Sequence, residues 1–147
     1  MTRRDERGSA LVELSWLGIL LVLPMLWIVM SVFEVQRGAF GVSSAARSAA
    51  RAYALAPDDA TGLLRARAAA RVALADEGLR DVRPEVAVTC TPYPGDCHQG
   101  TSVITVSVHS RVVLPLMPTA LGGNRPSFAL DASQTVPIGQ FQEVSGG

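Results

Sequence analysis

The sequence predicts an α+β protein: a long N-terminal transmembrane helix extends into a small head with a second helix and a three-stranded antiparallel sheet. Two observations carry this prediction. Residues 14–33 form a run of twenty residues without a charge. Three later segments alternate apolar and polar residues with the period of a β-strand. The chain has 147 residues, enough for one modest domain and an anchor.

The uncharged run extends from Leu14 to Phe33. At the rise of an α-helix it spans about 30 Å, the thickness of the hydrocarbon core of a bilayer. Pro24 lies inside the run, and membrane helices tolerate proline because neighbouring groups satisfy the freed carbonyl. A cleavable secretory signal is the main alternative, but its apolar region is shorter and ends at a small-residue cleavage site, which residues 31–34 do not provide. The run therefore predicts a membrane span.

The helix is expected to continue beyond the span to Ala56, because Pro57 then ends it. From Leu14 to Ala56 such a helix is about 65 Å long. Its outer half carries a seam of apolar and small residues at alternating spacings of four and three: Val35, Ala39, Val42, Ala46, Ala49, Tyr53 and Ala56. Small residues allow close approach of another helix or of the protein's own head, and the sequence leaves both interpretations open.

The head is expected to contain one helix and three strands. The helix begins at Asp58 or Asp59 as N-cap and ends near Glu77, with Gly78 as its stop. Its expected apolar positions are Leu63, Leu64, Val72 and Leu74. The strands are expected at residues 85–90, 101–113 and 127–136, with a turn-rich connection at 91–100 and an irregular loop, rich in proline and glycine, at 114–126.

The only two cysteines, Cys90 and Cys97, lie close together around the turn-rich connection. This placement predicts a local disulfide in a compartment outside the cytoplasm. The alternative is a zinc site that adds His98 and His109. Adjacent Cys97 and His98 do not match the ligand spacing of common zinc sites, so the disulfide is favoured and no metal or other cofactor is expected.

The charge of the chain limits the expected partners but does not fix the orientation of the membrane span. Thirteen arginines balance thirteen acidic residues, so no overall field attracts nucleic acid. Arginines flank the apolar run on both sides and do not orient it. The short N-terminal tail and the cysteine pair in the long remainder favour a single-pass protein of the cell membrane, with a cytoplasmic N-terminus and an extracytoplasmic head.

No catalytic motif is found in the head. The sequence has no phosphate-binding glycine loop, no nucleophile elbow and no carboxylate pair that spacing justifies, so an enzyme is not expected. Arg47 and Arg51, four residues apart on the expected helix, are interpreted as a solvated face rather than a binding patch.

Glu13 stands directly before the apolar run. A carboxylate in hydrocarbon protonates or finds a cation, because an ionised and unpaired one is costly there. Two interpretations remain: Glu13 pairs with a cation that the sequence does not supply, or it stays hydrated among the lipid headgroups.

The first part of the chain resembles the TadE-like family of the tight-adherence (Flp-type) pilus machinery. The resemblance covers residues 7 to about 56 and rests on three stretches in order: "RGSALVEL" before the span, "EVQRGAF" after it and "SSAARSAARAYA" beyond. Members of the family open with R-G-[small]-A-x-V-E-[apolar], followed by a membrane helix, an E-[apolar]-x-R element and an A-A-R-x-[small]-A-R stretch. Beyond residue 57 no resemblance is found.

The resemblance implies a prepilin-like organisation. Residues 1–8 would be a leader, 9–56 the transmembrane and extended helix, and 57–147 the extracytoplasmic head. A prepilin-type peptidase would cut between Gly8 and Ser9, and Glu13 would serve processing and subunit docking.

The function implied is that of a non-catalytic minor pilin or pseudopilin that assists assembly of the pilus or a related secretion structure. Its partners would be the membrane, other pilins and the assembly machinery. The residues expected to take part in assembly are Glu13, Glu34, Arg37, Ala46, Ala49 and Tyr53. The alternative is an uncleaved, single-pass anchored protein whose head binds an envelope partner or a glycan.

Overall fold

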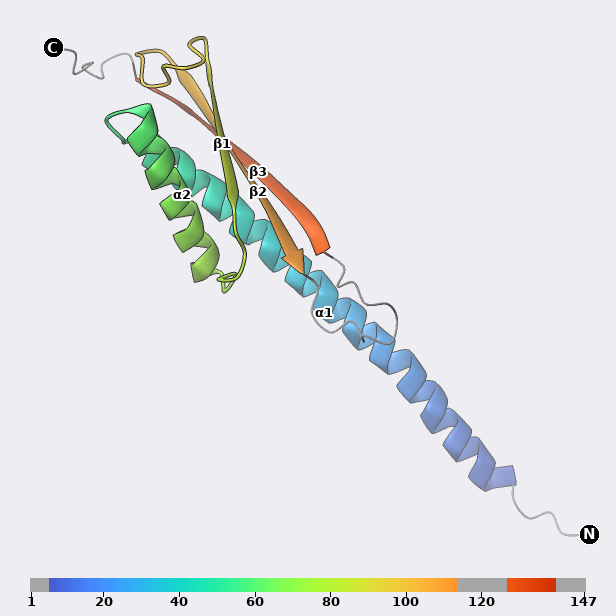
Figure 1. Ribbon diagram of the computed structural model, residues 1–147. Helices are drawn as coiled ribbons and strands as arrows, with labels where there is room; N and C mark the ends of the chain where they lie inside the picture. Colours follow the sequence, from blue (N-terminus) through green and yellow to red (C-terminus); the bar gives the residue numbers. More distant parts are fainter. Residues whose placement is uncertain (1–5, 114–126, 140–147) are drawn as a thin grey trace, which may run out of the picture. The chain divides into compact units, whose positions relative to one another are not determined.

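The structure is a computed structural model that describes residues 6–113 and 127–139 (Figure 1). Its elements are α1 (Glu6–Ala54), α2 (Asp59–Asp76), β1 (Glu85–Thr91), β2 (Val103–Val113) and β3 (Ser127–Pro137). The predicted α+β class, with two helices and three antiparallel strands, is confirmed. The loop expected at 114–126 lies outside the described residues.

The chain divides into two compact units, Met1–Glu34 and Val35–Gly147. We call the second unit the head. The head predicted from the sequence begins at residue 57, whereas this unit begins at Val35 and takes in the C-terminal part of α1. The reason is that α1 contributes buried residues from Val42 to Tyr53 to the core of this unit.

The sheet has the strand order β1-β2-β3, with both pairs antiparallel. Alternation places every second side chain in the core, with Ile104, Val106 and Val108 of β2 fully buried. The intervening residues form a polar outer face. Thr89, Thr105 and Thr135 lie opposite one another there, and the hydroxyls of Thr105 and Thr135 are 3.0 Å apart.

The C-terminal part of α1 supplies one wall of the head's core. Its buried residues form a stripe two residues wide: Gly38, Gly41, Val42, Ala45, Ala46, Ala49, Ala50 and Tyr53. Ala39, which the predicted seam included, is exposed. A wide stripe is typical of a helix packed on a globular core, whereas a narrow seam suits a coiled coil. In this structure the small-residue face therefore packs within the chain's own head.

Two glycines of α1 mark the closest approach of the head's side chains. A Cβ atom on Gly38 would lie 2.6 Å from Cδ1 of Leu130, and one on Gly41 would lie 2.8 Å from Cδ1 of Leu79. These distances are too short for real carbon contacts, so the apolar side chains occupy the space that a larger residue would need. Despite the low helix propensity of glycine, α1 runs unbroken through both positions.

The second helix begins as predicted. Asp58 is its N-cap, and the carboxylate accepts hydrogen bonds of 2.8 Å from both the backbone N–H and the hydroxyl of Thr61. Its buried stripe consists of Gly62, Ala66, Ala70, Ala73 and Leu74. Of the expected apolar positions, Leu64 and Val72 lie outside this stripe and are 67% and 61% exposed. Each lies two residues from a buried position, which places it on the other side of the helix.

The stripe on α1 can be tested by comparing two alanines of the predicted seam. Ala49→Leu inserts three carbon atoms into a fully buried position, so the free energy of unfolding should fall by about 1–3 kcal/mol. Ala39→Leu makes the same change at an exposed position and should leave stability within about 0.5 kcal/mol. Urea unfolding of the detergent-solubilised chain, followed by circular dichroism, measures both. Equal effects would show that the buried stripe is misassigned.

Candidate functional site

The first unit presents an unusually apolar surface. Along α1 from Leu11 to Phe33 the large apolar side chains other than the half-buried Trp27 are exposed, several by more than 60%. None of the most apolar stretch is buried in the described structure, and the helix is long and apolar enough to cross a membrane. An apolar surface of this extent is rare on a water-soluble monomer. The structure is thus consistent with a single-pass membrane anchor.

The two serine hydroxyls within this stretch are satisfied inside the helix. Ser15 donates to the carbonyl oxygen of Leu11 at 2.7 Å, and Ser31 donates to that of Trp27 at 2.9 Å. Such bonds to the residue four positions earlier leave no hydroxyl needing water, a condition that a hydrocarbon environment imposes.

Glu13 lies in α1 with its side chain exposed. Gly8 and Ser9 belong to the same helix, and Ser9 precedes Glu13 by four residues, about one helical turn. The three residues predicted for processing are therefore on consecutive turns at the start of one helix.

The other residues predicted for assembly are in different surroundings. Glu34 is half-buried, and the Nε atom of Arg37 donates to the carbonyl oxygen of Glu77 at 2.7 Å. Ala46, Ala49 and Tyr53 are each no more than 3% exposed and belong to the core of the head. The predicted set is thus not one surface.

The head contains the predicted bond between Cys90 and Cys97, whose Cα atoms are 5.4 Å apart. The bond closes the connection between β1 and β2. Within that connection the backbone N–H of Cys97 donates to Oδ2 of Asp59, the first residue of α2, at 3.1 Å. The disulfide loop is therefore attached to a helix that precedes it by about forty residues in sequence.

His98 makes a second attachment. Its Nδ1 atom lies 2.5 Å from Oδ1 of Asp59, and its Nε2 atom lies 3.1 Å from the carbonyl oxygen of Tyr53. Both partners are acceptors, so only an imidazolium that carries both protons donates to the two at once. The His98 ring also stacks on the Tyr53 ring, with centroids 5.2 Å apart. We call Tyr53, Asp59, His98 and the disulfide the junction cluster.

Gly62 leaves room for this stacked pair. A Cβ atom at this position would lie 3.0 Å from Cδ2 of Tyr53 and 3.4 Å from Cε1 of His98. The junction cluster was not predicted, because its members are far apart in sequence and no motif connects them. The only local signal was the position of Asp59 at the start of a helix.

The carboxylates at the start of α2 are held in their ionised form. Burial acts to raise the pKa of Asp59, but hydrogen bonds from His98 and from the backbone N–H of Cys97 outweigh it and lower that pKa below its ordinary value. The pKa of Asp58 is also lowered, first by the backbone N–H of Thr61 and then by the Thr61 hydroxyl.

The residues weighed for a zinc site do not converge. Both cysteines are in the disulfide, His98 bonds Asp59, and His109 bonds Asp131 at 2.6 Å on the outer face of the sheet. Within residues 6–113 and 127–139 no group of three or more histidine, cysteine, aspartate or glutamate side chains is arranged to hold a metal ion.

No protein-family model matches the chain, and no curated protein or solved structure shows significant similarity to it.

The role of Asp59 predicts an acid-sensitive stability. Its pKa is lower in the folded chain than in the unfolded chain, so its contribution is complete above the unfolded-state value of about 3.9 and is lost as pH falls through the folded-state value. Asp59→Asn should therefore lower the free energy of unfolding by about 1 kcal/mol at pH 7. This value takes into account that the site is partly exposed. Below pH about 4 the loss should become progressively smaller.

Denaturant unfolding of both proteins between pH 3 and 8 measures this difference. Asp81→Asn, at an exposed acid outside the junction cluster, is the matched control and should show no such trend. A difference between wild type and Asp59→Asn that does not change with pH would contradict the assignment.

The disulfide and Asp59 hold the same loop, so their effects should be coupled. Replacing both cysteines by alanine should lower the free energy of unfolding by about 2–3 kcal/mol, because the closed loop is short. The triple variant that adds Asp59→Asn should lose less than the sum of the two separate losses. Strict additivity would mean that the disulfide does not position the Cys97 N–H for Asp59.

Proposed function

We propose that the protein is a non-catalytic minor pilin or pseudopilin of the TadE-like type, which assists assembly of a tight-adherence pilus or a related secretion structure. One observation carries the proposal. Gly8, Ser9 and Glu13 stand in the prepilin-like order at the start of a single helix whose apolar side chains are exposed. A helix of this kind requires a hydrophobic environment, which a membrane or neighbouring pilin helices supply.

In this proposal the apolar residues 14–33 cross the cell membrane, the N-terminus is cytoplasmic and the head is extracytoplasmic. The disulfide of the head supports this topology, because such bonds persist mainly in oxidising compartments outside the cytoplasm. The balance of thirteen basic and thirteen acidic residues supports partners other than nucleic acid.

Processing supplies the cation that Glu13 lacks in the sequence. A prepilin-type peptidase that cuts after Gly8 leaves a free amine on Ser9, and an α-amino group is largely cationic at neutral pH. Ser9 and Glu13 are four residues apart on one helix, about one turn, so the amine is able to pair with the Glu13 carboxylate of its own chain. The same carboxylate is equally able to bind the amine of a neighbouring subunit, which would make docking depend on register.

The contacts with other pilins are assigned to the first unit. Ala46, Ala49 and Tyr53 are occupied by the head's own core and have little surface to offer a partner. The exposed apolar side chains between Leu11 and Phe33 have no such packing in the described structure. We therefore propose that residues 14–33 make the helix-to-helix contacts in the assembly.

Glu13→Gln tests the proposal, because it keeps the shape of the side chain and removes its charge. The variant should insert into the membrane normally but reduce pilus number by about tenfold or more, since each 1.4 kcal/mol of lost docking energy is a factor of ten. Pili counted by electron microscopy, with membrane levels checked by immunoblotting, give the answer.

Two variants control the experiment. Glu85→Gln makes the same change at an exposed position of the head and should leave pilus number unchanged, while Glu13→Asp retains the charge and should recover part of the activity. Wild-type pilus number in Glu13→Gln cells would show that the carboxylate is a bystander.

A further inference from the structure

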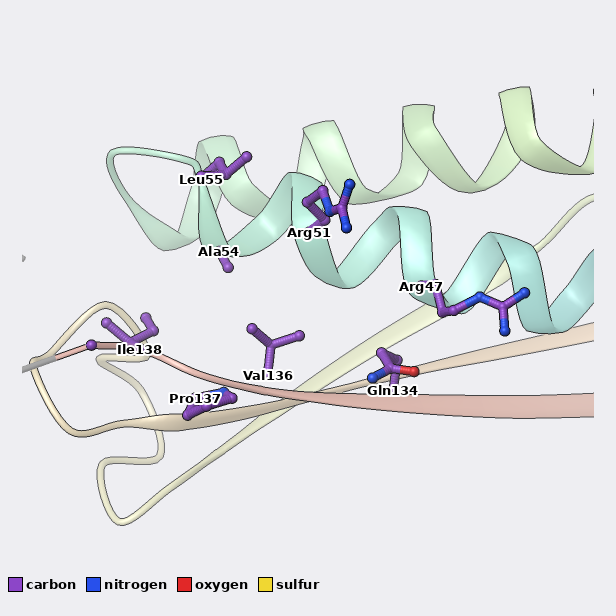
Figure 2. Close-up of a pocket in the computed structure, with 9 residues that line it drawn as sticks. Arg47, Arg51, Ala54, Leu55, Gln134, Val136, Pro137 and Ile138 are labelled. Carbon is purple, nitrogen blue, oxygen red and sulfur yellow. The ribbon is translucent and has the colours of Figure 1, made fainter.

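The head has a hollow of about 430 Å³ between the last turns of α1 and the second half of β3 (Figure 2). Arg47, Arg51 and Leu55 border it on the helix side, and Gln134, Val136 and Ile138 border it along the strand. In Figure 2 the two guanidinium groups project from successive turns of α1, and the side chain of Val136 points toward that helix. All these residues belong to the head.

The charge of this hollow is one-sided. Arg47 and Arg51 are exposed, and neither takes part in the ion pairs found among the described residues, which join His98 to Asp59 and His109 to Asp131. A second hollow of the head, beside β1 and β2, also has two arginines, but acidic side chains accompany them: Asp81, Glu85 and Asp131. Among the described residues that line the first hollow none is acidic, so this lining favours an anionic ligand.

Among the described residues, the strand beside the hollow is paired along one edge only. The sheet order places β3 at one end, where it pairs with β2 alone among the described strands. The backbone groups along its other edge, apart from Pro137, which has no N–H, are able to pair with an extended peptide. Apolar walls at Leu55, Val136 and Ile138 then suit a ligand that is not purely ionic.

The spacing of the arginines matches such a peptide. Residues four apart on a helix are separated by about 6 Å along its axis. Side chains two apart on a strand point to the same side and are separated by about 7 Å. Two carboxylates at alternate positions of an added strand therefore fit Arg47 and Arg51, while the residues between them point away.

We infer that this hollow binds an extended segment of a partner protein, which adds to the edge of β3 and places two carboxylates at alternate positions against Arg47 and Arg51. The inference holds whether or not the chain assembles pili, because it rests on the head alone. It also revises the interpretation of these arginines as a solvated face.

The test uses the full chain in phosphatidylcholine nanodiscs and a fluorescein-labelled peptide with blocked ends, Leu-Thr-Glu-Thr-Glu-Thr-Leu. Its sequence places two glutamates on one side and suits either strand direction. Fluorescence anisotropy should show saturable binding that weakens with added salt. A peptide with glutamine in place of both glutamates should bind at least about tenfold more weakly, because two charge-assisted hydrogen-bonded pairs are lost.

Variants of the protein locate the site. Arg47→Gln/Arg51→Gln should weaken binding of the glutamate peptide to the level of the glutamine peptide. Arg67→Gln/Arg71→Gln is the matched control, with the same spacing, exposure and charge change on α2, and should leave binding unchanged. Equal binding by wild type and Arg47→Gln/Arg51→Gln would overturn the inference, as would equal binding of the two peptides.

Two further probes test strand addition and the identity of the occupant. One peptide is N-methylated on the backbone of its three threonines, and a second on the backbone of its two glutamates and second leucine. Each set of methyl groups blocks one of the two edges of the extended peptide. One methylated peptide should therefore fail to bind and the other should bind. Unimpaired binding of both would exclude pairing with β3. A variant ending at Gly139 that binds the peptide where the full chain does not would assign the hollow to residues 140–147 and overturn the inference.

Discussion

The close approach of α1 to the sheet is the constraint on which the head depends. Alanine and glycine on the buried stripe bring the helix backbone near the apolar side chains of the strands, and Ala45, Ala49 and Ala50 are completely buried as a result. Larger residues at these positions would separate the layers and open voids that a core of this size has little means to fill. α2 uses the same device, since most of its buried residues are alanine or glycine.

This packing also positions the junction cluster. Tyr53 is the last buried residue of the α1 stripe, and its ring and carbonyl oxygen provide the surface on which His98 rests. Asp59 then joins α2 to the disulfide loop through His98 and the N–H of Cys97. One end of the head is thus fixed by a charge-assisted network and a covalent bond. In the same helix Arg47 and Arg51 lie outside the core and border the hollow beside β3.

The sequence was informative wherever a pattern is local. Twenty uncharged residues, alternating strands and an aspartate before a helix each reflect the geometry of one element, and the elements were found close to their predicted bounds. The buried face of a helix is harder to predict than the helix itself. Leu64 and Val72 suggested a core by hydrophobicity, but the neighbouring layer selects small residues, and hydrophobicity does not report that requirement. The junction cluster could not be predicted, because His98 and Asp59 are 39 residues apart in sequence and no local pattern connects them.

We propose that Glu13 acts with a new amino terminus at Ser9, and the intact mass of the chain extracted from its native membrane is the sharpest test of this proposal. Our account predicts a mass that lacks residues 1–8, with a free amine on Ser9. It also predicts that Gly8→Val, which leaves the apolar run untouched, retains those residues. A native chain that keeps residues 1–8 would contradict the account and favour an uncleaved membrane-anchored protein.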